Sequence, residues 1–159
     1  MQAHIDDILE YAHLDPLKLQ MHDDLRNGGY TRRDAREIAQ ELYRLTGINL
    51  KRDLDQYRAT DCGDLVCDDP DFPLIIECKR RASGGFQTAW WQQASRAAIA
   101  QNKRAAVIYR FDRQPTRVRV QLRTAMELIS GGRWSAPDQH LIDIDLDGLA
   151  YLIREGVNA

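Results

Sequence analysis

The stretch that decides the fold reads Asp64-Leu-Val-Cys-Asp-Asp-Pro-Asp-Phe-Pro-Leu-Ile-Ile-Glu77-Cys78-Lys79. It predicts two short strands joined by a turn, because Asp and Pro favour turns and the flanking runs are apolar. Side chains alternate along a strand, so Glu77 and Lys79 are expected on one face. Asp64 belongs to the preceding strand of the hairpin and can lie beside Glu77. The stretch therefore brings two carboxylates and an ammonium together at the end of an apolar strand.

This set of side chains points to a metal ion. Crowded carboxylates repel each other unless a cation lies between them, and oxygen ligands suit Mg²⁺ or Mn²⁺. The backbone carbonyl of Cys78 is a candidate third oxygen beside Asp64 and Glu77. Such a metal activates water and stabilises charge on a phosphoryl oxygen, while Lys79 orients the water or offsets the developing charge. The pattern predicts metal-assisted phosphodiester hydrolysis; the alternative is a surface hairpin with an ordinary Glu-x-Lys pair.

Helices and strands alternate on both sides of this stretch. Apolar periodicity and Gly47 predict a helix that starts at Thr31 and ends before that glycine. Further strands are expected over residues 48–59, 105–111, 117–123 and 140–146. Further helices are expected over residues 5–14, 86–102 and 125–130, and from an Asp147 cap to the end. This order predicts an α/β fold, with a mixed β-sheet flanked by helices.

Length and composition limit the class of protein. With 159 residues the chain fits one domain, which we place at residues 28–159 after an N-terminal helical extension at 1–27. The three cysteines are too few for a disulfide framework and lack zinc-ligand spacing. No apolar run is long enough for a bilayer span, and the N-terminus does not resemble a signal peptide. We therefore expect a soluble protein without a membrane partner, in the cytoplasm, or the host cytoplasm if a phage encodes it.

Positive charge is concentrated in the middle of the chain. Residues 76–133 carry 12 Lys and Arg against 3 Asp and Glu, although the whole chain has a net charge of −2. Such asymmetry is typical of a face that binds a polyanion, and equally of a surface whose opposite charges meet in the fold. Phosphate contacts from this segment would hold DNA without reading its sequence. The adjacent Trp90 and Trp91 either pack the helix on the sheet or stack on an unpaired base.

The central motif resembles that of the PD-(D/E)xK nucleases, with Gly63 where the motif often has proline. Phage and prophage members of this superfamily, endonucleases and resolvase-like proteins among them, show similar neighbouring segments, and the likeness covers about residues 31–125. Those segments are Asn49-Leu50, Leu54 to Arg58, Arg80-Arg81 and Trp91 to Ala94. The resemblance implies a restriction-endonuclease-like fold and a Mg²⁺-dependent DNA endonuclease for which Mn²⁺ can substitute. It also implies a cut that leaves a 5′-phosphate and a 3′-hydroxyl, branched or Holliday-junction DNA as a substrate, and a homodimer.

The resemblance assigns roles to individual residues. Asp64 and Glu77 would bind the metal, and Lys79 would be the catalytic lysine. Glu37 looks like the helix glutamate that archaeal Holliday-junction resolvases place near the metal, with Glu41 one turn later as a competitor. Gln93 matches a glutamine directed at the site, with Gln92 as the alternative register. The candidate DNA-binding residues are Arg58, Arg80, Arg81, Arg96, Arg110, Arg113 and Arg117.

Two other functions fit parts of the sequence. A non-catalytic DNA-binding module on the same scaffold explains the basic segment, but it does not need acidic side chains facing a phosphate. A structural or partner-binding protein, acting for instance through the acidic N-terminal helix, predicts no salt-dependent affinity for DNA.

Overall fold

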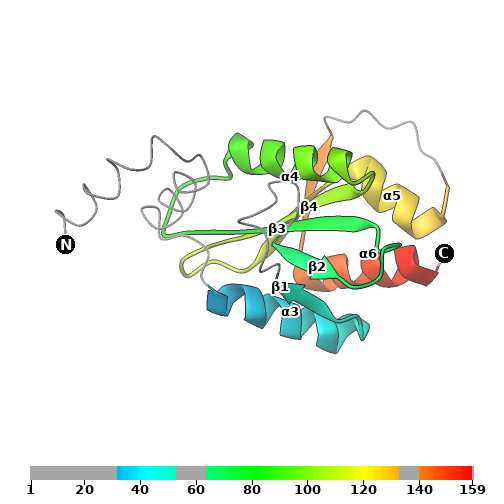
Figure 1. The fold of residues 1–159 in the computed structure, drawn as a ribbon. Helices are drawn as coiled ribbons and strands as arrows, with labels where there is room; N and C mark the ends of the chain where they lie inside the picture. The colour runs from blue at the N-terminus through cyan, green and yellow to red at the C-terminus, as the bar shows by residue number, and fades with distance from the viewer. Residues whose placement is uncertain (1–31, 53–63, 133–139, 159) are drawn as a thin grey trace, which may run out of the picture.

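The computed structural model describes residues 32–52, 64–132 and 140–158 (Figure 1). Six strands form one sheet in chain order, with β3 and β4 parallel and all other neighbours antiparallel. The strands are β1 (Leu50–Arg52), β2 (Leu65–Cys67), β3 (Leu74–Arg81), β4 (Arg104–Phe111), β5 (Arg117–Gln121) and β6 (Leu141–Ile144). The helices are α3 (Arg32–Thr46), α4 (Thr88–Ala100), α5 (Leu122–Ser130) and α6 (Leu146–Asn158). The mixed sheet flanked by helices confirms the predicted α/β class.

The helices cover the two faces of the sheet unequally. Of the described helices, α4 covers one face, whereas α3 and α6 cover the other and α5 packs against α6 (Figure 1). The parallel pairing of β3 with β4 requires a crossover connection, and α4 provides it. Buried alanines of α4, among them Ala94 and Ala97, pack on Ile75 and Val107. The larger core lies on the opposite face of the sheet.

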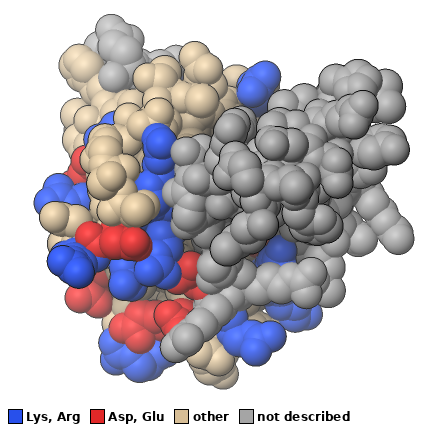
Figure 2. Space-filling view, turned by 90° about the vertical axis from the view of Figure 1, so that its left-hand side faces the viewer, with Lys and Arg blue, Asp and Glu red and all other residues tan. Residues whose placement is uncertain are grey.

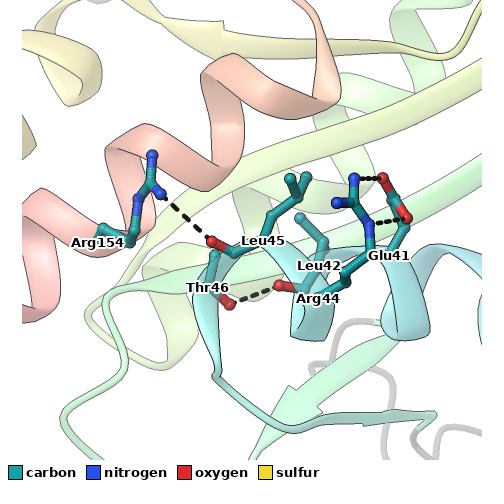
Figure 3. Close-up of polar contacts among 6 residues, drawn as sticks. All are labelled: Glu41, Leu42, Arg44, Leu45, Thr46 and Arg154. Atoms are coloured by element: carbon teal, nitrogen blue, oxygen red, sulfur yellow. Dashed lines mark hydrogen bonds and ion pairs between the residues drawn. The ribbon is translucent and has the colours of Figure 1, made fainter.

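Helix α3 is held at its carboxyl end by several polar contacts (Figure 3). The Thr46 hydroxyl donates to the Leu42 carbonyl at 2.6 Å, and Arg154 of α6 donates to the Leu45 carbonyl at 3.4 Å. Gly47 then adopts a left-handed conformation with φ of 73° and donates its N–H to the Tyr43 carbonyl. This conformation is costly for residues with a Cβ, which explains why glycine ends the helix.

Some predicted boundaries differ from the structure. The sequence predicts a strand over 117–123, but β5 ends at Gln121 and α5 begins at Leu122 rather than at residue 125. Arg and apolar residues go on alternating from β5 into α5, so the two-residue periodicity does not locate the boundary between them. Burial of Thr124, Ala125 and Leu128 in α5 shows the helical spacing that replaces it.

The aspartate that caps α6 is Asp145 and not the predicted Asp147. Asp147 lies inside the first turn, and the Asp145 carboxylate instead accepts the N–H of Gly148 at 2.7 Å. Asp145 is therefore the residue that satisfies an amide at the start of this helix. The predicted helix at 5–14 and most of the predicted strand at 48–59 lie outside the described residues.

No helix within the described ranges has the length and apolar character needed to cross a membrane.

An ion pair joins β5 to β6. Arg119 donates to both carboxylate oxygens of Asp143 at 2.9 Å, and the Tyr109 hydroxyl on β4 donates to the same carboxylate at 2.9 Å. The hydrogen bonds from Arg119 lower the pKa of Asp143 below its ordinary value of 3.8. A lowered native-state pKa means that this pair stabilises the fold above pH 3.8, and that the contribution is lost as pH falls through the native pKa.

We therefore expect Asp143→Asn to lower the free energy of unfolding by about 1 kcal/mol at neutral pH, the upper end for an ion pair near the surface. The difference from the wild type should shrink in acid, because the wild-type carboxylate is then also neutral. Urea denaturation at several pH values measures it. Asp71→Asn, an exposed carboxylate before β3, is the matched control and should show little change. If the difference in unfolding free energy between Asp143→Asn and the wild type persisted unchanged in strong acid, it would not come from the Arg119–Asp143 ion pair.

Candidate active site

Three charged side chains are buried in the described part of the chain, and they are the three that the central motif predicts. Asp64 is 6% exposed, Glu77 is 2% exposed and Lys79 is 8% exposed. Charged residues are rarely buried unless they are paired, and clusters of them in folded proteins often mark functional sites.

Asp64 is fixed to the central strand by its backbone and its side chain. Its N–H donates to the Ile76 carbonyl at 2.8 Å, which extends the pairing of β2 with β3 by one residue. Its carboxylate accepts the backbone N–H of Cys78 at 2.7 Å. The carboxylate therefore lies against the peptide that links Glu77 to Lys79, as the hairpin predicts.

Lys79 connects the strand to helix α4. Its ammonium lies 3.9 Å from a carboxylate oxygen of Glu77 and donates a hydrogen bond to the side-chain oxygen of Gln93 at 2.9 Å. Gln93 lies on α4, so the Glu77–Lys79 pair faces this helix. Gln93, rather than the exposed Gln92, is the glutamine that reaches the predicted lysine.

The local sequence explains how β3 holds these groups. The strand is buried from Leu74 to Lys79 between β2 and β4. Alternate residues enter the two cores: Ile76 and Cys78 pack in the larger core, whereas Ile75 packs under α4. Glu77 and Lys79 follow Ile75 by two and four residues, so their side chains project from the same face of the strand as Ile75. The apolar packing of Ile76 and Cys78 on the other face holds the strand in this orientation.

The donor set at this site fits a hard divalent cation. Mg²⁺ is commonly held by one or two carboxylates with the remaining positions filled by water, and Asp64 and Glu77 supply two buried carboxylates on paired strands. Within the described ranges, no three His, Cys, Asp or Glu side chains form a group that could hold a metal.

A family model with the description "Phage putative PDDEXK endonuclease" matches residues 35–143. The chain belongs to this family. The match includes the whole of the site just described, from Asp64 to Gln93, and it confirms the resemblance drawn from the motif. No curated protein matches. Hjc, a Holliday junction resolvase from Archaeoglobus fulgidus, is a similar solved structure, with a TM-score of 0.44 and 19% identity over 71% of this chain and 85% of that one.

Glu37 lies in different surroundings from the buried carboxylates. It is exposed on α3 and borders a pocket of about 180 Å³, with Glu41 on the same helix and Lys79 and Arg80 on the sheet. Helix α3 lies on the face opposite α4. Glu37 and Glu41 both reach this pocket, so the role of either as a further metal ligand stays a prediction.

The predicted DNA-binding arginines of this family member differ in their surroundings. Arg80 is paired with Asp34 at 2.8 Å and Asp112 at 3.1 Å, and the hydrogen bond that it donates to Asp112 is the main cause of its raised pKa. Arg81 is half-buried, and Arg58 lies outside the described residues. The exposed residues are Arg96, Arg110, Arg113 and Arg117. Figure 2 shows basic side chains gathered at one end of the molecule, with acidic ones among them.

The two aspartates that pair with Arg80 are not predicted from the sequence. Asp34 is 46 residues away in the chain and Asp112 is 32 residues away. No local pattern joins these positions; only their opposite charge was available as a signal.

Gln93→Leu should lower the rate of DNA cleavage by about 10- to 100-fold, because loss of its hydrogen bond frees the Lys79 ammonium from its position. We predict that Gln93 is a positioning residue, so the pH profile of cleavage should change together with the rate. Gln92→Leu, an identical change on the exposed neighbour, is the control. Equal losses in the two variants would show that Gln93 does not act through Lys79.

Proposed function

We propose that the protein is a Mg²⁺-dependent endonuclease that hydrolyses phosphodiester bonds in DNA. The observation that carries the proposal is the burial of Asp64, Glu77 and Lys79 around one segment of β3, with the lysine held by Gln93. This arrangement occurs in a chain of an endonuclease family. Mn²⁺ should replace Mg²⁺, because both ions prefer oxygen ligands.

Each residue has a task in this mechanism. Asp64 and Glu77 would hold the ion, which when bound supplies Lewis acidity at a phosphoryl oxygen and lowers the pKa of water. The Lys79 ammonium, close to Glu77 and held by Gln93, orients the attacking water and offsets charge that develops on the phosphate. Attack at phosphorus by water leaves a 5′-phosphate and a 3′-hydroxyl, as the family motif implies.

We extend the proposal to branched or junction DNA, on the likeness of the motif set to resolvase-like members of the superfamily. A homodimer in the cytoplasm would suit this task, because two copies of the site can then cut paired strands. The exposed arginines named above would hold the phosphate backbone, and binding should weaken as salt rises.

The proposal predicts a defined pattern of cleavage. Purified protein should cut at least one of linear, nicked, flapped and four-way DNA in Mg²⁺ or Mn²⁺, and none of them in EDTA. Gel electrophoresis of end-labelled strands measures the cut and its position. A salt-sensitive affinity for DNA without cleavage of any substrate would instead support a non-catalytic DNA-binding module. The absence of salt-sensitive affinity would support a partner-binding protein.

A further inference from the structure

A larger pocket lies next to the candidate active site. It has a volume of about 490 Å³, within the range of ligand-binding pockets. It is bordered by residues 82–84, which follow β3, by Asp112, Gln114 and Pro115, which follow β4, and by residues of β4 and β5. The two connecting loops lie at the same end of the sheet (Figure 1). Clefts beyond the carboxyl ends of parallel strands are common binding places in α/β folds.

The strand register makes this pocket continuous with the catalytic strand. Tyr109, which borders the pocket, is the partner of Lys79 on one side and of Arg117 on the other. Two residues earlier on β4, Val107 is the partner of both Glu77 and Arg119. Paired residues of neighbouring strands project on the same face. The pocket therefore shares the α4 face of the sheet with Glu77 and Lys79.

Aromatic rings form one side of the pocket. Phe86, Tyr109 and Phe111 border it, and the ring centroid of Tyr109 lies 5.0 Å from that of Phe86 and 5.9 Å from that of Phe111. Trp90 lies behind them, 5.3 Å from Phe86 and 6.3 Å from Phe111. Tyr109 is buried, whereas Phe86 and Phe111 are only partly buried. The rings fix one another, and Phe111 keeps part of its surface exposed at the border of the pocket.

Two arginines also border the pocket, and one of them stacks on an aromatic ring. The Arg119 guanidinium lies 3.9 Å from the centre of the Phe86 ring, and Asp143 holds it by two hydrogen bonds. Arg117 is exposed and also borders the pocket. Asp112 borders it too, but its carboxylate is paired with Arg80. The pocket thus combines apolar ring faces with a net positive charge.

We propose that this aromatic–arginine pocket binds an unpaired nucleotide of the DNA substrate, with the base against Phe111 and a phosphate at Arg117. Every base has a face that stacks on an aromatic ring, whereas a base inside a duplex cannot leave its neighbours without a cost in free energy. The inference rests on the proposed function and specifies its substrate. DNA with an unpaired nucleotide beside the cut should bind more tightly than fully paired DNA.

Fluorescence anisotropy in EDTA tests this, with the full chain and two labelled DNAs, a blunt duplex and the same duplex carrying a single-stranded flap. The wild type should bind the flapped DNA more tightly. Phe111→Leu should weaken that binding by about fivefold or more, while duplex affinity stays within about twofold. Arg117→Gln should weaken the binding of both DNAs, because Arg117 is also a proposed contact of the duplex backbone, but the loss should be about fivefold or more larger for the flapped DNA. Lys103→Gln removes a positive charge at the other end of β4 and should affect both DNAs equally.

Each outcome decides a different statement. Equal weakening of both DNAs by Arg117→Gln, or no weakening, overturns the pocket while leaving the nuclease in place. A wild type that binds neither DNA overturns the nuclease and the pocket together. Arg117 is exposed, so its variant decides the matter even if Phe111→Leu fails to fold. A flap containing 5-iododeoxyuridine should also photo-crosslink to Phe111, and crosslinks confined to other segments would contradict the assignment.

Discussion

Replacement of either buried carboxylate, as Asp64→Asn or Glu77→Gln, should lower Mg²⁺-dependent DNA cleavage by about a thousandfold or more. The ion supplies several kcal/mol of charge stabilisation in the transition state, and about 1.4 kcal/mol corresponds to a tenfold change in rate. Each change keeps the shape of the side chain and removes one charged ligand oxygen. Cleavage rates under single-turnover conditions measure the loss.

Binding to DNA separates this effect from unfolding. In EDTA both variants should bind DNA as well as the wild type or more tightly, because a negative charge that faces the phosphate has been removed. Asp71→Asn makes the same chemical change at an exposed position before β3 and should leave cleavage near the wild-type rate. Wild-type cleavage by both site variants would refute the assignment of Asp64 and Glu77.

Leu42→Ala should lower the free energy of unfolding by about 2–5 kcal/mol, the usual cost of a cavity left by a buried leucine. Leu42 is 0% exposed on α3 and packs in the larger core. Its neighbour Tyr43 is 56% exposed, and Tyr43→Ala should change stability by only about 0.5 kcal/mol. Urea denaturation followed by circular dichroism measures both. Similar losses in the two variants would show that α3 is not held through Leu42.

The cluster of buried charged residues could be predicted because its geometry is local. Asp64, Glu77 and Lys79 lie on one hairpin, so strand alternation and a turn are enough to bring them together. The sequence alone does not decide whether Gln93 or Gln92 points toward Lys79. It depends on the rotation of α4 about its axis, which is set by the packing of Ala94 and Ala97 against the sheet.

The aromatic–arginine pocket could not be predicted in the same way. Its rings and arginines come from the β3–α4 loop, β4 and β5, and Arg119 is held by Asp143, 24 residues further along the chain. The sequence shows these residues as separate members of a basic segment. Only the order and register of the strands reveal that Tyr109 lies between Lys79 and Arg117.

This register has a geometric consequence for where a strand of DNA would be cut. Neighbouring strands lie about 4.8 Å apart, so two steps across the sheet separate Lys79 from Arg117 by about 10 Å of rigid backbone. A phosphate anchored at Arg117 would present a later bond of the same strand to Lys79 at a constant offset. The sheet would then fix the distance between the anchored phosphate and the cleaved bond. The cut would fall a constant number of nucleotides from the branch point whatever the base sequence.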